Sequence, residues 1–234
     1  MTVTLLSRYA DDPSRPTLAQ AGGDLARRTL LPAVALWAAI VAIGLVIVGP
    51  LRSLPAELAV NRALEAGRTP AWNTVTAVWT HIGGTVFIIS AALIMVAVLW
   101  WRTKQWWLAV VPLIAVSVQS AVFVTAAAVV GRGRPEVEHL DVAPPTSSFP
   151  SGHVGASTAL YLTLAMLSQR ISSPVLRWVA TLVCLAVPVF VAYSRLYRGM
   201  HHLSDVLVGA LNGVVCAWLA WRYLRRTEQP QTRA

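Results

Sequence analysis

The chain has 234 residues, of which 56% are hydrophobic and only 12% are charged. Soluble domains carry about 25% charged residues, so this composition excludes an ordinary soluble protein and indicates an integral membrane protein. The net charge of +9 does not indicate a nucleic-acid-binding protein, because the basic residues lie at the ends of apolar segments and form no single basic run. We therefore expect membrane lipids, and no nucleic acid, as partners.

The N-terminal 28 residues are polar and precede the first apolar segment. A cleavable signal peptide places its apolar region close to the start, so this segment does not resemble one. We expect residues 1–28 to form a cytoplasmic N-terminal tail and residues 29–223 to form one membrane domain. Residues 224–234 are then a cytoplasmic C-terminal tail.

Six stretches of the chain are apolar, with uncharged cores of at least sixteen residues, and approach the length of about 20 residues that a membrane-spanning helix requires. The sequence therefore predicts an all-α, polytopic membrane protein built as a six-transmembrane-helix bundle. The predicted spans are Leu30–Val48, Gly84–Trp101, Trp106–Val130, Ser151–Leu167, Val175–Tyr193 and Leu203–Trp221.

A shorter helix is predicted between the first two spans, over Ser53–Arg68. Leu54, Leu58 and Leu64 fall roughly on one helical face there, with charged residues on the rest of the surface. This pattern is typical of an amphipathic helix that lies on a membrane surface, here the extracytoplasmic one.

In the last predicted span, Gly209 and Gly213 form a pair of small residues four positions apart. Such pairs let two helices approach closely, either within one chain or between two chains. We expect close packing within the monomer, and the sequence leaves the oligomeric state open.

The positions of arginine and lysine predict the orientation in the membrane, because positive charge is retained on the cytoplasmic side. Twelve of the 19 Lys and Arg residues lie in the two terminal segments and in two connections between spans. The other seven lie in the alternate connections. We therefore expect a multi-pass plasma-membrane protein with both termini in the cytoplasm.

Three polar clusters lie at ends of the predicted spans on the opposite, extracytoplasmic side. They are Arg132-Gly133-Arg134-Pro135, Pro150-Ser151-Gly152-His153, and Ser194-Arg195 followed by His201 and Asp205. Arginine keeps its charge and binds phosphoryl oxygens with two hydrogen bonds, while histidine exchanges protons near neutral pH. The clusters therefore predict one phosphate-handling site.

The two histidines suit different steps of a phosphoryl transfer. Asp205 follows His201 by four residues, so it can fix the imidazole tautomer and leave the other ring nitrogen to attack phosphorus. His153, at the start of the fourth predicted span, is placed to protonate the leaving group and then to activate water. The expected intermediate is a phosphohistidine.

Phosphate binding is assigned to Arg134, Arg195 and the backbone around Ser151-Gly152, because a helix N-terminus is a natural anion site and glycine permits close approach. This scheme requires no metal and no cofactor. A zinc site built from His201, His202 and Asp205 is the alternative. The flanking arginines argue against it.

The chain resembles the type 2 phosphatidic acid phosphatase (PAP2) superfamily, which also includes bacterial undecaprenyl-diphosphate phosphatases, glucose-6-phosphatase and vanadium haloperoxidases. The second family motif is present unaltered at Pro150–His153, and the third is matched by Ser194, Arg195, His201 and Asp205. The first motif matches at Arg134-Pro135, but the lysine expected seven residues earlier is replaced by Ala127.

The resemblance implies a six-helix bundle, a nucleophile at His201 supported by Asp205, proton transfer by His153, and phosphate binding by Arg134, Ser151, Gly152 and Arg195. Whether Arg132 supplies the positive charge that is missing at Ala127 stays open.

A lipid phosphate is the implied substrate. Undecaprenyl diphosphate is our leading candidate, and phosphatidic acid and phosphatidylglycerol phosphate are the alternatives. A phosphotransferase and a non-catalytic membrane protein also stay open.

Overall fold

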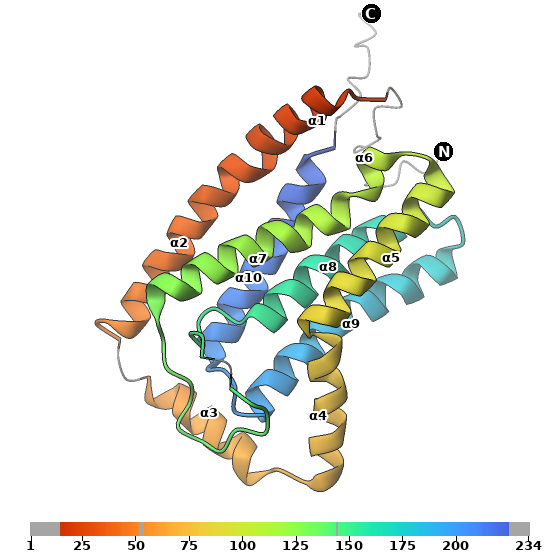
Figure 1. Cartoon of the computed structure of the whole chain (residues 1–234). Helices are drawn as coiled ribbons and strands as arrows, with labels where there is room; N and C mark the ends of the chain where they lie inside the picture. Colours follow the sequence, from red (N-terminus) through yellow and green to blue (C-terminus); the bar gives the residue numbers. More distant parts are fainter. Residues whose placement is uncertain (1–14, 52–53, 144, 225–234) are drawn as a thin grey trace, which may run out of the picture.

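The computed structural model describes residues 15–51, 54–143 and 145–224, and every regular element in those ranges is a helix (Figure 1). The arginines at positions 8, 52, 225, 226 and 233, which entered the charge count, lie outside the described residues. The predicted all-helical membrane fold is confirmed.

The first helix begins earlier than the sequence predicted. Helix α1 (Leu18–Leu25), the π-helical turn η2 (Ala26–Leu30) and α2 (Leu31–Val48) follow one another without a break. Thr17 caps this helix: its hydroxyl accepts a hydrogen bond from the Gln20 amide, and the Gln20 side chain accepts one from the Thr17 amide. The segment predicted to be a tail therefore contributes α1.

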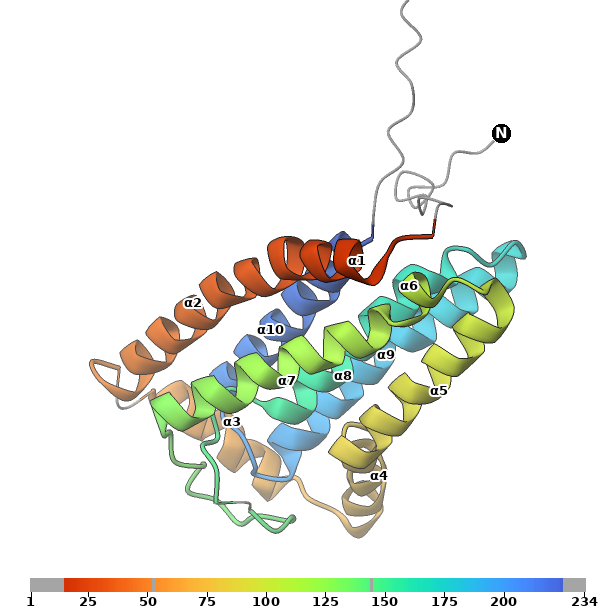
Figure 2. The ribbon, with the colours of Figure 1, turned by 45° about the horizontal axis from the view of Figure 1, so that its top comes forward.

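The remaining predicted spans match helices in the bundle. Five helical stretches of the described chain are long and apolar enough to cross a membrane. Helix α8 is shorter, with 17 residues, and lies in the middle of the bundle, so the count of six spans stays a prediction (Figure 2). The helices are α5 (Thr85–Thr103), α6 (Trp106–Ala109), α7 (Val111–Val130), α8 (Gly152–Ser168), α9 (Pro174–Tyr197) and α10 (Leu203–Arg222).

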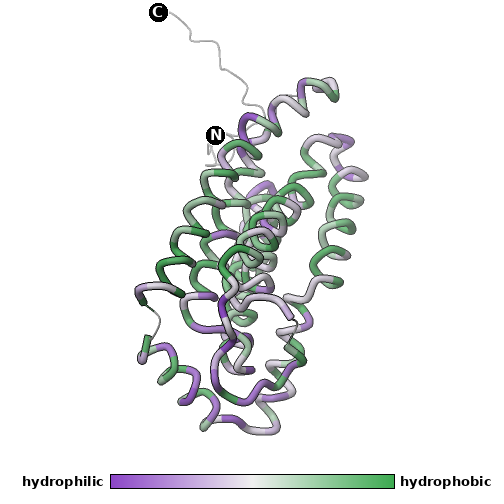
Figure 3. The backbone as a smooth tube through the Cα atoms, turned by 60° about the vertical axis from the view of Figure 1, so that its left-hand side comes forward, coloured by the Kyte–Doolittle hydropathy of each residue, from purple (hydrophilic) through white to green (hydrophobic). Residues whose placement is uncertain are grey.

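Two short helices and a long loop gather at one end of the bundle, which is also its more hydrophilic end (Figures 1 and 3). Helix α3 (Pro55–Ala66) is the predicted amphipathic helix, but its buried residues are Glu57 and Asn61. Helix α4 (Pro70–Ile82) was not predicted. The face that α3 turns to the protein is therefore polar, which points to a polar structure beneath it.

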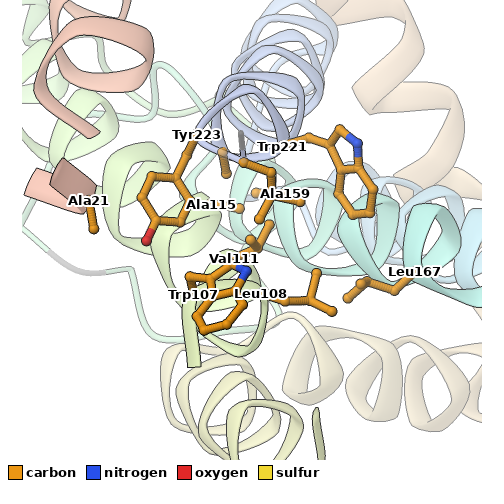
Figure 4. Close-up of a cluster of buried hydrophobic side chains, with 11 residues drawn as sticks. Ala21, Trp107, Leu108, Val111, Ala115, Ala159, Leu167, Trp221 and Tyr223 are labelled. Carbon is orange, nitrogen blue, oxygen red and sulfur yellow. The ribbon is translucent and has the colours of Figure 1, made fainter. Parts of the chain in front are cut away.

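The opposite end of the bundle is held by a buried apolar cluster (Figure 4). Trp107 and Leu108 of α6 pack there with Trp221 of α10 and with Ala21 of α1. Helices in a membrane associate through such close packing of side chains. This cluster fixes the helices at the end away from the polar loops.

Helices α8 and α10 approach closely through the predicted glycine pair. A Cβ at Gly209 would lie 2.6 Å from the Ser151 carbonyl oxygen, and one at Gly213 would lie 2.5 Å from the Gly155 carbonyl oxygen. Neither space can hold a methyl group. The expected packing within the monomer is confirmed, and it brings the second and third motifs together.

Candidate active site

Residues from all three motifs line one cavity of about 460 Å³. They come from the loop after α7, the start of α8, the end of α9 and the turn before α10, which meet at the polar end of the bundle (Figures 1 and 2). The motif residues in the wall are Arg134, Gly152, His153, Arg195 and His201. The spans thus bring together side chains that are far apart in sequence.

His201 is buried, with 4% of its surface exposed. Its Nδ1 lies 2.8 Å from the Ser148 carbonyl oxygen, so Nδ1 carries the proton and donates it to that oxygen. The ring nitrogen Nε2 is then left with a free lone pair. This is the tautomer that a nucleophilic imidazole requires.

Asp205 does not make the hydrogen bond to His201 that the sequence suggested. The distance from His201 Nδ1 to Asp205 Oδ2 is 3.7 Å, which is too long for a hydrogen bond. The carboxylate instead binds Arg132 and accepts a 2.8 Å hydrogen bond from the His202 amide, at the start of α10. Ser148 therefore fixes the tautomer, and Asp205 contributes a nearby negative charge.

Arg132 joins two buried carboxylates. It donates to Asp205 and, over 2.7 Å, to Glu57 of α3, and it also donates to the Ser204 hydroxyl. Burial raises the pKa of Glu57, but the hydrogen bonds from Ser204 and Arg132 outweigh burial and the net shift is downward. Arg132 lines a neighbouring cavity of about 550 Å³, so its guanidinium is engaged in structure rather than aimed at the catalytic cavity.

Arg134 and Arg195 present guanidinium groups to the cavity. Arg134 donates a 2.7 Å hydrogen bond to the Met200 carbonyl oxygen, beside the nucleophile. Arg195 is 3% exposed and donates to Asp141 over 2.7 Å, whereas its Nε has no hydrogen-bond partner in the protein. A buried donor without a partner is rare. The Nε–H group of Arg195 is therefore suited to binding an anion.

Asp141, in the long loop, is part of the site, although no sequence motif pointed to it. It receives hydrogen bonds from Arg195 and from Arg198, and it lines the cavity. Burial raises the pKa of Asp141, but the hydrogen bonds from the two arginines prevail and the net shift is downward. The carboxylate is therefore charged and faces the region where a phosphate would bind.

Helix α4 supports the same arginines. The Thr80 hydroxyl accepts a 3.2 Å hydrogen bond from Arg195, and Asn73 and Thr76 accept from Arg198. From α3, Asn61 donates to the His201 carbonyl oxygen over 3.1 Å. Sequence reasoning missed these residues, because their partners lie more than a hundred positions away. The one local signal was the position of Arg198, three residues after Arg195.

The Pro-Ser-Gly-His segment is tied to α10 through its backbone. The Ser151 amide donates a 2.9 Å hydrogen bond to the Asp205 carbonyl oxygen, so this amide is already used. The Ser151 hydroxyl is fully buried and has no partner. The phenyl ring of Phe123 packs against Gly152, where a Cβ would lie 2.7 Å from the ring. The first backbone amides of α8 have no partner within the helix, so they can bind an anion at its N-terminus.

Burial lowers the pKa of His201 from its ordinary value, although the neighbouring Asp205 acts in the opposite direction. The imidazole is therefore neutral at pH 7. Among the described residues, no three His, Cys, Asp or Glu side chains gather closely enough to hold a metal ion. Ala127, where the family has lysine, is buried in α7.

The site and the helical bundle define a membrane phosphatase of PAP2 type. The family model described as the PAP2 superfamily matches residues 108–229, which is more than half of the chain. The chain belongs to the PAP2 superfamily. The resemblance seen in the motifs is thereby confirmed.

Two solved structures are similar to the whole bundle. One is the transmembrane PAP2-type phosphatidylglycerolphosphate phosphatase from Bacillus subtilis, with a TM-score of 0.70 and 25% identity over 80% of this chain and 93% of that one. The other is LpxE from Aquifex aeolicus, with a TM-score of 0.58 and 19% identity over 73% and 98% of the two chains. The second match shows the shared fold. The search of curated proteins found no match.

Proposed function

We propose that the protein hydrolyses a lipid-linked phosphate through a phosphohistidine on His201. The observation that carries this proposal is the convergence of Arg134, His153, Arg195 and His201 on one cavity. His201 presents an unprotonated Nε2, because its proton stays on Nδ1, which donates a hydrogen bond to the Ser148 carbonyl oxygen.

In the first step, His201 Nε2 attacks phosphorus, the bond from phosphorus to the lipid oxygen breaks, and His153 gives that oxygen a proton. In the second step, His153 takes a proton from water, which attacks phosphorus and releases phosphate from His201. Arg134 and Arg195 hold the equatorial oxygens as charge develops on them. Gly152 lines the cavity, whereas Ser151, which the motif assigned to phosphate binding, does not.

A lipid is the proposed substrate because the cavity does not end at the polar groups. It is also lined by Ile88 of α5 and by Val116 and Phe123 of α7, which are residues of apolar helices. A hydrocarbon chain suits these walls. The sequence favoured undecaprenyl diphosphate, but the similarity to a phosphatidylglycerolphosphate phosphatase favours the alternative, a glycerolipid phosphate.

The deciding experiment measures phosphate release in detergent, with a metal chelator present, from phosphatidic acid, phosphatidylglycerol phosphate and undecaprenyl diphosphate. We expect His201→Ala to lower kcat by about 10⁴-fold or more, as loss of a covalent nucleophile does. His81→Ala is the matched control, since His81 is exposed and bonds only its own helix at Ala77. A wild type inert on every lipid, or an active His201→Ala, would refute the proposal.

The same experiment separates the rival functions. A phosphotransferase would yield a phosphorylated acceptor without an equal amount of free phosphate. A non-catalytic protein would bind lipid phosphate and release nothing. Quenching the wild type with alkaline detergent during turnover of labelled substrate should trap a phosphohistidine, which is stable in base, and His201→Ala should lack it.

We further propose that this site faces the extracytoplasmic side of the plasma membrane, with both termini in the cytoplasm. The support is the charge distribution along the sequence. Glu138 lies in the loop beside the site, and its side chain is 75% exposed. A Glu138→Cys variant should react with an impermeant thiol reagent in intact cells, whereas reaction only after lysis would reverse the orientation.

A further inference from the structure

The side chain of Gln119 lies in the wall of the catalytic cavity without a partner. Gln119 belongs to α7 and is fully buried, and neither its amide nitrogen nor its amide oxygen has a hydrogen-bond partner in the protein. Buried amides are nearly always hydrogen-bonded. A polar residue inside a membrane span is costly to keep and is typical of a functional position.

Helix packing does not account for this side chain. The contact of Gln119 with α10 uses its backbone carbonyl oxygen, which accepts a 3.3 Å hydrogen bond from Asn212. The side chain lies over Gly155 of α8, where a Cβ would come within 2.2 Å of the Gln119 amide nitrogen. The absence of a side chain at Gly155 therefore leaves room for the amide.

The depth of Gln119 relative to the phosphate site follows from its helix. Phe123, four residues further along α7, packs against Gly152 at the level of the catalytic motif. Gln119 is therefore about one helical turn, or ~5.4 Å, deeper in the bundle than that level. Ile88 and Val116 make the cavity wall apolar around it.

A lipid whose phosphate is held by Arg134 and Arg195 would place its first few bonds beyond phosphorus at this depth. In phosphatidic acid, those bonds lead to ester carbonyl groups, which accept hydrogen bonds. In a polyprenyl monophosphate, they lead to hydrocarbon alone, and the buried amide would stay without a partner. The unpartnered amide thus fits the glycerolipid better.

We propose that Gln119 is a specificity-determining residue that donates a hydrogen bond from its amide nitrogen to an ester carbonyl of a glycerolipid phosphate. The inference rests on the proposed function, because it concerns the substrate of that same site. A site that hydrogen-bonds its substrate rejects an analogue lacking the acceptor. Gln119 thereby favours phosphatidic acid over a polyprenyl monophosphate.

The test compares two substrates that differ only in the acceptor: diacyl phosphatidic acid and its dialkyl ether analogue, which lacks the carbonyl groups. Both are presented in the same mixed micelles at equal surface concentration. We expect the wild type to prefer the ester in kcat/KM by at least about tenfold. Gln119→Leu should reduce this ratio to near one.

The control variant is Thr158→Val. The Thr158 hydroxyl is also buried in a bundle helix without a partner, but it lines a separate apolar groove of about 320 Å³. This variant should keep the ester preference of the wild type. A general effect of removing a buried polar group would instead change both variants alike.

The outcomes separate the two proposals. If the wild type hydrolyses no lipid phosphate, the proposed function fails. If it hydrolyses ester and ether lipids equally well, or if Gln119→Leu keeps the full ester preference, the role of Gln119 is refuted and the phosphatase stands. Should Gln119→Leu fail to fold, the ester-to-ether ratio of the wild type alone decides.

Discussion

The carboxylate of Asp141 lies 2.7 Å from Nη1 of Arg195 inside the catalytic cavity. The loop between α7 and α8 therefore places a negative charge on the guanidinium that is proposed to hold the phosphate. This charge orients Arg195, and it also repels an incoming phosphate. The first effect contributes to the stability of the protein, and the second weakens the binding of phosphate.

The first prediction concerns Asp141→Asn. Removing the charge relieves repulsion, so inorganic phosphate should inhibit more strongly, with a severalfold lower inhibition constant. The variant also weakens the bonds to Arg195 and Arg198, so the free energy of unfolding should fall by about 1–3 kcal/mol. Inhibition kinetics and thermal unfolding in detergent measure the two effects.

Glu136→Gln is the control for this variant, since Glu136 is an exposed acid in the same loop. It should change neither quantity. The pKa of Asp141 is lowered in the folded protein. Its contribution to stability is therefore complete above the usual carboxyl pKa of about 3.9 and is lost as the pH falls through the lowered value. A stability profile of the wild type that is flat through acid pH would contradict this.

The second prediction concerns the protonation of His201. Burial lowers the pKa of its imidazole, so the ring should stay neutral and nucleophilic below the usual value of about 6.5. Activity that depends on the neutral ring should then be lost only as the pH falls through the lowered pKa. An NMR titration of the histidine rings measures the pKa of His201 directly, and the His201→Gln variant assigns its signal. Titration of His201 at or above pH 6.5 would contradict the structure.

The third prediction concerns Arg132, which joins Glu57 and Asp205. Removing one partner of a buried ion pair leaves a charge without compensation, so Arg132→Met should cost about 3–5 kcal/mol of stability. Arg132→Lys should not restore it, because an ammonium group lacks the planar fork that reaches both carboxylates. Denaturation of the single variants and of the double variant with Glu57→Gln gives the coupling energy.

Arg62→Met is the matched control for Arg132, because Arg62 is an exposed arginine of α3. The free energy of unfolding of this variant should differ from that of the wild type by less than about 0.5 kcal/mol. If Arg132→Met were equally harmless, the bridge between the two carboxylates would have no structural role.

The fourth prediction concerns the lysine that the family has at position 127. The guanidinium of Arg132 is engaged by Glu57 and Asp205, so we expect that it does not replace the missing charge. Ala127→Lys should therefore tighten inhibition by inorganic phosphate by about fivefold or more, the equivalent of one charge-assisted hydrogen bond.

Ala127→Met is the comparison for Ala127→Lys, since it adds a long side chain without charge. It should leave phosphate inhibition unchanged. Equal inhibition constants for the lysine and methionine variants would mean that position 127 does not reach the phosphate.

The sequence predicted the parts of the fold and the site that depend on local patterns. The spans followed from apolar runs, and the meeting of His153 and His201 at one cavity followed from compact motifs. Helix α4 was missed, although Thr69 and Pro70 form a typical helix start. Its 13 residues are fewer than the roughly 20 that a membrane-spanning helix requires.

The partners of the motif residues could not be predicted in the same way. Ser148 is 53 positions from His201, and Glu57 is 75 positions from Arg132. Their contacts exist only because the bundle brings its polar loops to one end. The sequence also did not predict that Arg132 and the His202 amide hold the carboxylate of Asp205.

The hydrogen bond from the Ser151 amide to the Asp205 carbonyl oxygen has a consequence for how the chain tolerates rearrangement. Together with the close contact at Gly209, it holds the two catalytic segments by backbone atoms rather than by the polypeptide that connects them. A peptide inserted after the exposed Ser172, between α8 and α9, should leave the spacing of His153 and His201 intact. Even a circular permutation opened at that loop should give an active enzyme.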